Sequence, residues 1–328
     1  MPAGSAPQGP LCPGTAHRIF TGAPVPEGSD AVVMQEDVVR DGDFVVLNRA
    51  VHPAQHIRFA GEEREAGSAL VPPGVLLGPR EIAASAAAGQ DCVAVRPRLR
   101  LAILTSGDEV RESGSDLSEG EIWDVNAPML QAALTSPATE IVDIVHVADN
   151  PGAVLRAIAA LVPRVDLLVT CGGVSVGEED HMKQVIHALG GETLFSGVAL
   201  KPGKPVTLGR VGNCHWLGLP GNPLSAFVTW QLFGKPLLQV LSGVARSAVP
   251  RRMVVLNEAV SHKAGRCEIR PARLCGPDMQ GRDRVICEPG LNSARIASLH
   301  ATDGLLFLPS EVDHLPQGSL VEFQPFYD

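Results

Sequence analysis

The stretch from Asp166 to Ala226 constrains the fold most strongly, because apolar runs in it alternate with turns rich in glycine and proline. Asp166–Thr170 has the Val and Leu content of a buried strand, and Glu179–Leu189 has apolar residues at helical spacing. The turn between them contains Gly172, Gly173, Ser175 and Gly177. A strand, a glycine-rich loop and a helix in this order form a ligand-binding crevice in open α/β sheets.

A second turn of the same kind follows the apolar run Trp216–Leu219. Its residues are Pro220, Gly221, Asn222 and Pro223. Asn222 suits the N-cap and Pro223 the first position of a helix that we expect over Leu224–Leu241. The free N–H groups at the start of that helix would attract a phosphate or an oxyanion.

Two of the chain's five lysines, Lys201 and Lys204, lie between these turns in the sequence KPGKP. The flanking prolines fix the backbone around both side chains. One glycine-rich turn alone would be interpreted as an ordinary connection of a doubly wound sheet. Three consecutive turns rich in Gly, Pro, Lys, Asp and Asn favour a ligand site.

The composition excludes several classes of protein. A hydrophobic content of 45% over 328 residues predicts a globular chain of two or three domains. A net charge of −9 argues against a nucleic-acid surface, and no apolar run is long enough for a membrane helix. The seven cysteines form no CxxC pair, and we expect free thiols in the cytoplasm.

The first 97 residues suggest three segments. We expect a disordered start over residues 1–16, a β-rich segment over 17–75 and a connecting helix or linker over 76–97. The β-type runs are Asp30–Gln35 and Phe44–Leu47, with a hairpin turn at Asp41-Gly42. The helix is expected over Pro79–Gly89, with its buried face formed by Ile82, Ala83 and Ala86.

Residues 98–245 predict an α/β domain with a parallel sheet. Strands are expected at Leu99–Thr105, Glu140–Val147 and Asp166–Thr170, alternating with helices at Asn126–Leu134 and Pro151–Val162. Acidic residues follow the strands and the loop, among them Glu109, Asp149 and Asp180. Carboxylates gathered at one rim suit Mg²⁺, although each alone could be a solvated loop charge or a helix cap.

Residues 246–328 predict a small β-barrel or sandwich. Short β-type runs are expected at Met253–Leu256, Cys267–Arg270, Val285–Cys287, Gly304–Leu308 and Leu320–Phe323. Arg266, Ser293 and Arg295 are its polar residues of interest, with ordinary surface polarity as the alternative.

Gly173–Gly177 also matches the G-x-S-x-G pattern of serine hydrolases. It lies between a strand and a helix, as that motif requires. No oxyanion motif of the hydrolase type precedes it, and too few strands do. A hydrolase is therefore the weaker interpretation.

Five motifs in order resemble the molybdopterin molybdenumtransferase (molybdenum insertase) family, which includes the C-terminal domain of gephyrin. They are RIFTGAPVPEGSDAVVMQE from Arg18, TSGDE from Thr105, CGGVSVGEEDH from Cys171, KPGKP from Lys201 and GLPGNPLSA from Gly218. The resemblance runs from about His17 to the C-terminus. It implies an α/β molybdopterin-binding domain flanked by a partial β-rich domain and a C-terminal β-barrel.

The resemblance also implies a reaction. Adenylylated molybdopterin and molybdate would be the substrates, and molybdenum would pass to the dithiolene with Mg²⁺-dependent release of AMP. It implies catalytic roles for Thr21, Glu109, Asp149 and Asp180, the last three also holding Mg²⁺. The glycine-rich loop and the Pro220–Pro223 turn would bind the pterin phosphate. The implied molybdate contacts are Lys201, Lys204, Arg266 and Ser293.

Two departures from the family pattern affect this expectation. The chain lacks the N-terminal helical segment and the AMDGYA-type motif, so we expect an N-terminally truncated chain whose homodimer is weakened. Gly197 also stands where the family often has Lys or Arg, which removes one cation from the oxyanion pocket.

Three functional hypotheses follow from the sequence. The first is a molybdenum insertase, with a molybdopterin adenylyltransferase as a partner. The second is an adenylyltransferase-like enzyme, which shares the glycine-rich loop but would need neither the TGAP turn nor the barrel. The third is an inactive or scaffold-like molybdopterin-binding protein.

Overall fold

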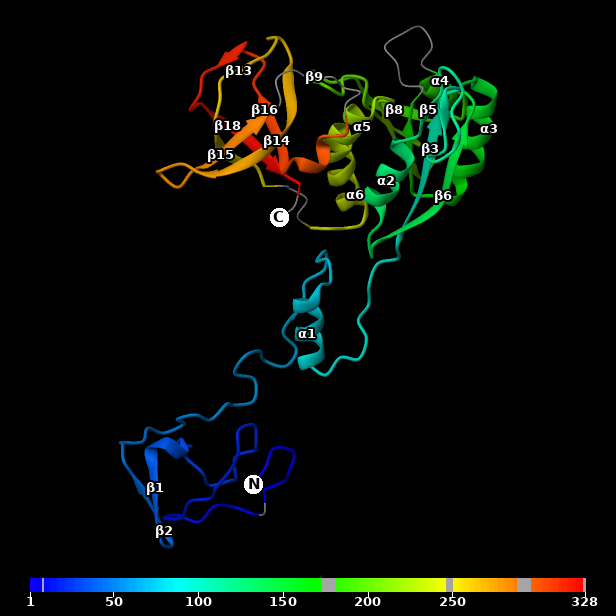
Figure 1. Ribbon diagram of the computed structural model, residues 1–328. Helices are drawn as coiled ribbons and strands as arrows, with labels where there is room; N and C mark the ends of the chain where they lie inside the picture. The colour runs from blue at the N-terminus through cyan, green and yellow to red at the C-terminus, as the bar shows by residue number, and fades with distance from the viewer. Residues whose placement is uncertain (8, 173–180, 246–249, 288–295, 327–328) are drawn as a thin grey trace. The chain divides into compact units, whose positions relative to one another are not determined.

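The computed structural model describes residues 1–328 except 8, 173–180, 246–249, 288–295 and 327–328. The chain divides into two units, Met1–Pro72 and Pro73–Asp328, and each is described by itself (Figure 1). No helix in the described residues is long and apolar enough to cross a membrane.

The N-terminal unit contains one β-hairpin, formed by β1 (Val38–Asp41) and β2 (Phe44–Leu47). Asp41 pairs with Phe44, which confirms the predicted turn, and Gly42 adopts the left-handed conformation at φ 59°. The predicted strand Asp30–Gln35 is wrong: a short 3₁₀ helix, Gln35–Asp37, begins there instead. Its acidic residues, Glu36 and Asp37, are poor strand formers and favour a helical first turn.

The first sixteen residues contain no helix or strand in their described part. Two backbone hydrogen bonds connect them to the next segment, from Leu11 N–H to Glu27 O at 2.7 Å and from Phe20 N–H to Met1 O at 3.0 Å. Disorder of this segment in solution stays a prediction, as do the other domain boundaries.

Helix α1 (Pro79–Ala87) begins with Pro79 at its first position, and the Glu81 side chain accepts the Gly78 N–H. The helix is where the sequence predicts it, but its predicted buried face is wrong. No residue of α1 is buried, and Ile82 is 60% exposed. Periodicity fixes which residues share a helix face but not whether another element covers that face.

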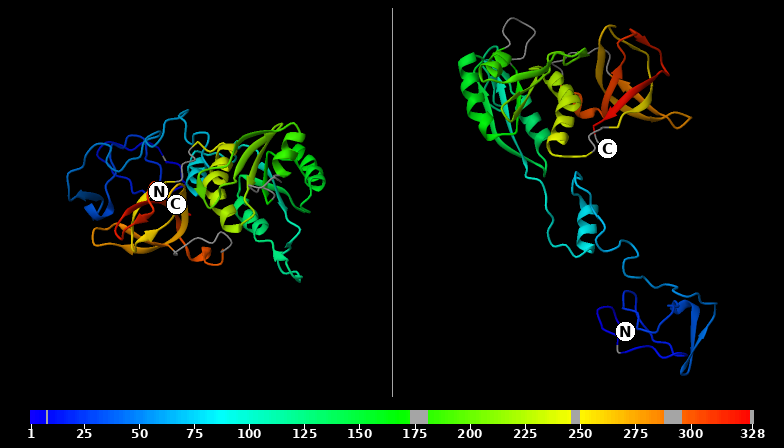
Figure 2. Two further views of the ribbon diagram at one scale, coloured as in Figure 1. Left: turned by 90° about the horizontal axis from the view of Figure 1, so that it is seen from above. Right: turned by 180° about the vertical axis from the view of Figure 1, so that it is seen from behind.

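The α/β domain is built on a six-stranded sheet with the order β6-β3-β7-β11-β10-β8 (Figures 1 and 2). Its first four strands are parallel, as predicted, whereas β10 and β8 add an antiparallel edge that the sequence analysis missed. In sheet order, the strands are Thr139–Val147, Leu99–Ser106, Leu167–Cys171, Cys214–Leu219, Thr207–Val211 and Glu192–Ser196.

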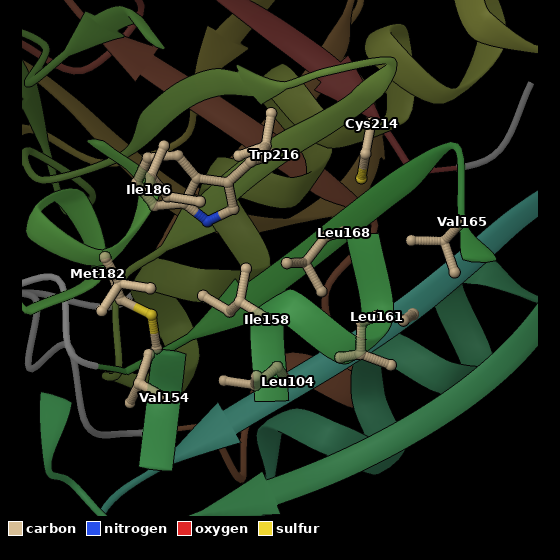
Figure 3. Packing of buried hydrophobic residues seen from close by; sticks show 13 residues of the cluster. Leu104, Val154, Ile158, Leu161, Val165, Leu168, Met182, Ile186, Cys214 and Trp216 are labelled. Atoms are coloured by element: carbon tan, nitrogen blue, oxygen red, sulfur yellow. The ribbon is translucent and has the colours of Figure 1, made fainter. Parts of the chain in front are cut away.

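Helices cover both faces of this sheet, so its central strands are apolar throughout. On one face α3 (Pro151–Leu161) and α4 (His181–Ala188) pack against Ala102, Leu104 and Trp216 (Figure 3). On the other face α2 (Asn126–Leu134) and α5 (Pro223–Thr229) pack against Leu101 and Ile103. The Trp216 indole N–H donates to Thr170 Oγ1 at 2.9 Å, which satisfies the one polar group of this buried ring.

The long helix predicted over Leu224–Leu241 is continuous but not uniform. It comprises α5, a π-helical segment at Trp230–Gly234, and α6 (Lys235–Leu241). A Cβ on Gly234 would overlap the Trp230 ring, so glycine is required where the wider turn brings that ring over the backbone.

The C-terminal domain is a closed five-stranded barrel, because β15 pairs with both β12 and β14. In barrel order the strands are β12 (Arg252–Leu256), β18 (Leu320–Pro325), β16 (Gly304–Leu308), β14 (Cys267–Pro277) and β15 (Asp283–Cys287). This confirms the predicted barrel and the predicted positions of its strands. Short two-stranded ladders elsewhere are Val110–Arg111 with Ile122–Trp123 and Val260–Ser261 with His314–Leu315.

The barrel contacts the α/β domain through a helix and through a strand. Leu224 and Val228 of α5 pack against Ile269, Leu305 and Phe307 of the barrel. In addition β9 (Leu200–Lys201), which precedes the KPGKP turn, pairs in parallel with the first residues of β14.

Candidate functional site

Three parallel strands of the α/β domain end side by side and define the candidate site. In register, Thr105 near the end of β3 lies opposite Cys171 at the end of β7, and Cys171 lies opposite Leu219 at the end of β11. The ends of these strands and the residues that follow them therefore meet at one rim. They include Ser106, the last residue of β3, Gly172 and the turn from Pro220 to Pro223.

Gly172 lies at the centre of this rim. Its φ is +95°, and a Cβ at this position would lie 2.6 Å from Ser106 O and 3.1 Å from Ser106 Oγ. On its other side, a Cβ on Gly221 would lie 3.5 Å from the Gly172 Cα. Both predicted glycines thus leave bare backbone at this rim, which is the arrangement that lets a ligand approach main-chain N–H groups.

Asn126, which the sequence analysis did not select, connects α2 to this rim. Its side-chain amide donates to Gly221 O at 2.7 Å, while its Oδ1 is buried without a partner among the described residues. Ser106 Oγ is likewise buried and without a partner in that part of the chain. Two such atoms at one rim are expected where a ligand completes the hydrogen bonding.

Asp124 holds this end of α2 and connects it to β3. Its Oδ1 accepts the N–H groups of Asn126 and Ala127, at 2.8 and 2.9 Å, and its Oδ2 accepts the Thr105 hydroxyl at 3.1 Å. Because that hydroxyl donates to the carboxylate, it accepts the Nδ1–H of His146 at 3.0 Å. An Asp two residues before a predicted helix is the sequence signal that could have identified this cap.

Cys171 is not a candidate nucleophile. Burial raises the pKa of its thiol, the charge of Asp124 raises it further, and its Sγ donates to Pro220 O at 3.0 Å. The thiol therefore stays protonated and helps to hold the turn after β11 against the end of β7.

Two of the three predicted metal-binding carboxylates lie at neighbouring strand ends. Glu109 follows β3 and Asp149 follows β6, both exposed, and Asp108 Oδ1 accepts the Asp149 N–H at 3.0 Å. Gly107, at φ +147°, makes room for the Glu109 carboxylate, since a Cβ there would lie 3.0 Å from its Oε2. The described residues contain no group of three His, Cys, Asp or Glu side chains that could hold a metal ion.

The turn after β11 begins α5 as the sequence predicts. Asn222 occupies the N-cap and Pro223 the first helical position. The Asn222 carbonyl accepts the Ala226 N–H at 2.9 Å, the first hydrogen bond of the helix, but the Asn222 side chain makes no capping hydrogen bond. Pro220 is buried, and Gly221 is exposed.

The three described members of the predicted molybdate set lie at or near the pairing of β9 with the barrel. Lys201 donates from Nζ to Glu268 Oε2 at 2.8 Å, and an Arg266 guanidinium nitrogen lies 3.5 Å from Leu200 O. Lys204 is exposed in the same turn. Gly203 fixes this turn against α5, because its φ is +106° and a Cβ there would overlap Thr229 Cγ2.

Several predicted site residues lie outside the described residues. These are Gly173, Ser175, Gly177, Asp180 and Ser293, together with Arg295. Thr21 lies in the N-terminal unit, exposed beside Gly22 at φ +81° in the predicted TGAP turn. Gly197 has φ +80°, so its turn after β8 is one that favours glycine.

A cavity of about 420 Å³ lies between α2, α5 and the barrel. Phe227 and Phe326 form part of its wall, with ring centroids 5.1 Å apart in an edge-to-face arrangement. The other lining residues are Val125, Met129, Gln231, Ile296, Leu299, His300 and Thr302. Val125, which lines the cavity, directly precedes Asn126 of the candidate site. The cavity and the candidate site are therefore both next to the start of α2.

Three family models match consecutive parts of the chain. Residues 1–89 match the MoeA N-terminal region (domain I and II), residues 102–240 the probable molybdopterin binding domain, and residues 253–326 the MoeA C-terminal region (domain IV).

Relatives and a solved structure agree with these models. Molybdopterin molybdenumtransferase 2 of Mycobacterium tuberculosis is 33% identical over 98% of this chain and 80% of its own length. The molybdopterin molybdenumtransferase of Haemophilus influenzae is 37% identical over 70% of this chain and 57% of its own length. A crystal structure of the molybdopterin biosynthesis MoeA protein from Pyrococcus horikosii matches with a TM-score of 0.81 and 28% identity, covering 100% of this chain and 80% of that one. The chain belongs to the molybdopterin molybdenumtransferase family, whose relatives are named as transferases of molybdenum cofactor biosynthesis.

Proposed function

We propose that this chain is a molybdopterin molybdenumtransferase that takes adenylylated molybdopterin and molybdate as substrates. Molybdenum passes to the dithiolene, the phosphoanhydride bond is cleaved, and AMP is released with the help of Mg²⁺. One observation supports this most directly. Ser106 Oγ and Asn126 Oδ1 are buried and without partners among the described residues, beside the bare backbone of Gly172 and Gly221.

The pterin phosphate binds at the ends of β7 and β11 in this proposal. Main-chain N–H groups of the glycine-rich loop and of the Pro220–Pro223 turn surround it, because glycine brings no Cβ that would keep an anion away. The proposed binding residues are Gly172, Gly173, Ser175, Gly177, Pro220, Gly221, Asn222 and Pro223. The Ser106 hydroxyl and the Asn126 amide orient the substrate, since each has a polar atom without a partner among the described residues.

Glu109 and Asp149 are the described residues that would hold Mg²⁺, with Asp180 as the third proposed ligand. Mg²⁺ in phosphate-transfer sites commonly uses one or two carboxylates together with waters and substrate phosphates, so two exposed carboxylates on neighbouring strand ends fit it. When bound, the ion would neutralise the charge that develops on the phosphoanhydride oxygens. Asp108 contributes by holding the Asp149 backbone.

Molybdate binds near Lys201, Lys204, Arg266 and Ser293 in this proposal. The oxyanion needs donors and positive charge, and the described members of this set supply both. Thr21 contributes a hydroxyl from the TGAP turn. We further propose that the protein acts in the cytoplasm as a homodimer and receives its substrate from a molybdopterin adenylyltransferase.

Isothermal titration with adenylylated molybdopterin tests this function. With Mg²⁺ and molybdate present, we expect binding followed by release of one AMP per chain. Glu109→Gln should still bind the substrate but lose the dependence on Mg²⁺, whereas Glu112→Gln, a nearby exposed carboxylate, should behave as the unchanged protein. Absence of substrate binding in the unchanged chain would contradict the proposal.

A further inference from the structure

A partly buried cluster of charged side chains lies where β9 of the α/β domain pairs with β14 of the barrel. Lys201 and Glu268 are direct partners in this parallel pair. Glu268 Oε2 accepts the Lys201 ammonium at 2.8 Å, and Glu268 Oε1 accepts two Arg270 nitrogens at 2.7 and 2.6 Å. One carboxylate thus connects a cation of each domain.

The Glu268 carboxylate is charged although its side chain is only 1% exposed. Burial by itself raises the pKa of this carboxyl, but the hydrogen bonds from Lys201 and Arg270 outweigh burial, and the net direction is downward. Arg270 is equally enclosed, with 5% of its side chain exposed, and also donates to Ser261 O at 2.9 Å. A charged group of this kind persists in a protein interior only when its partners are held in place.

Lys201 differs from both partners because 40% of its side chain is exposed. An ammonium group has three donors, and the Glu268 contact directs one of them into the protein. Arg266 lies at the same end of the strand pair, since its guanidinium approaches Leu200 O. The exposed part of Lys201 and Arg266 therefore form the outer side of the cluster.

The exposed side of the cluster is positive in the part of the chain that the structure describes. Lys201 and Arg266 bring two cations there, and the Glu268 carboxylate lies behind the Lys201 ammonium. A small oxyanion would be attracted to this side of the cluster.

We propose that Glu268 is a positioning residue that holds the Lys201 ammonium in the orientation needed to bind the oxyanion substrate. This inference rests on the proposed function, because it takes Lys201 and Arg266 as contacts of molybdate. Glu268 itself is enclosed and does not touch the oxyanion. It acts by restricting a side chain that would otherwise sample many rotamers, so the donor is already oriented when the anion arrives.

A purely structural role is the alternative, in which Glu268 only connects the two domains. The two roles differ in what happens when Lys201 is absent. A positioning residue has nothing left to position in Lys201→Met, so adding Glu268→Gln should not weaken molybdate binding further. A structural residue should weaken binding by the same factor in either background.

The test is equilibrium dialysis with molybdate, read out as bound molybdenum, on the unchanged 328-residue chain and on three variants. We expect Glu268→Gln and Lys201→Met each to bind molybdate about tenfold more weakly, the usual effect of losing one charge-assisted hydrogen bond. The double variant should be no weaker than Lys201→Met. Affinity for molybdopterin, which binds at the rim of the sheet, should be unchanged in all three.

The matched control is Glu322→Gln, which removes a carboxylate from an exposed ion pair of the same barrel. It should leave molybdate binding unchanged. Equal factors for Glu268→Gln in both backgrounds, or no effect of Glu268→Gln at all, would overturn the inference. If Glu268→Gln does not fold, Glu268→Asp tests the same point, because it keeps the charge but withdraws the carboxylate by one methylene. Unchanged molybdate affinity in Glu268→Asp would then overturn it.

The unchanged chain separates this inference from the proposed function. If it binds no molybdate, the proposed function fails together with the inference. If it binds molybdate and the variants behave additively, only the role of Glu268 fails.

Discussion

Gly172 approaches Ser106 so closely that no other residue fits between the ends of β7 and β3. A Cβ on Gly172 would lie 2.6 Å from Ser106 O, and its φ of +95° is a conformation that residues with a side chain rarely adopt. The rim of the proposed pterin site thus depends on a glycine for geometry as well as for access to the backbone.

Gly172→Ala should lower the free energy of unfolding by about 3 kcal/mol, because it combines backbone strain with a backbone clash. Gly190→Ala is the matched control, since Gly190 has φ +74° but a Cβ there would have no neighbouring atom within 4 Å. The control should lose only about 1 kcal/mol. Urea unfolding measures both free energies. Equal losses of stability in the two variants would show that the clash with Ser106 adds nothing to the backbone strain.

Ser106→Ala should separate stability from ligand binding. The Ser106 hydroxyl is buried and has no partner among the described residues, so its removal should change stability by less than about 0.5 kcal/mol or increase it. Affinity for adenylylated molybdopterin should fall about tenfold, because the hydroxyl is expected to bond to the substrate.

Thr170→Val is the contrasting variant on the neighbouring strand. It leaves the buried Trp216 indole N–H without its acceptor, so it should cost about 1–3 kcal/mol while the substrate contacts stay in place. A loss of stability in Ser106→Ala as large as that in Thr170→Val would show that the hydroxyl is already satisfied within the protein.

Acid should weaken the contact between the two domains through Glu268. Its folded-state pKa is lowered, so it contributes stability that is fully present above the unfolded-state pKa of about 4.3. That contribution is lost as the pH falls through the lower folded-state value. Melting temperatures measured from about pH 7 to about pH 3 should fall less steeply for Glu268→Gln than for the unchanged chain. Parallel curves would mean that Glu268 does not titrate with a lowered pKa.

Gly197→Lys should restore a cation near the proposed oxyanion site. The backbone at φ +80° makes the substitution cost about 1–2 kcal/mol of stability, although the nearest atom to a Cβ there is Lys204 O at 3.8 Å. Molybdate affinity should rise about fivefold if the new charge lies within a few ångströms of the anion. Gly190→Lys carries the same strain at the other end of β8 and should not change this affinity. A rise of the same size in Gly190→Lys would indicate a general charge effect.

The core strands of the α/β domain and the barrel could be predicted because local patterns specify them. Gly304–Leu308 and Asn126–Leu134 have the predicted bounds, since an apolar run or a helical period is punctuated there by Gly, Pro or Asn. The edge strands β8 and β10 could not be predicted in this way. Glu192–Ser196 is largely exposed, so it has no apolar run. Gly209 in β10 is a residue type that favours turns, and glycine is needed there because the Trp216 ring packs against it.

The candidate site was predictable as a set of turns but not as a set of contacts. Glycines and prolines identify the turns at Gly172 and Pro220 from the sequence alone. Asn126, which donates to Gly221 O, is 95 positions away from it, and no local pattern connects them. Likewise nothing near Lys201 indicates that Glu268, 67 positions later, accepts its ammonium group. Such contacts are determined by the packing of domains rather than by sequence spacing.

Release of AMP tests the central proposal most directly. The purified chain is mixed with adenylylated molybdopterin, Mg²⁺ and molybdate, and AMP and protein-bound molybdenum cofactor are measured together. We expect AMP and the bound cofactor to form in equal amounts. Omission of Mg²⁺ or the Glu109→Gln substitution should prevent the formation of both products. Substrate that binds but yields neither product under any of these conditions would contradict the proposed transferase activity.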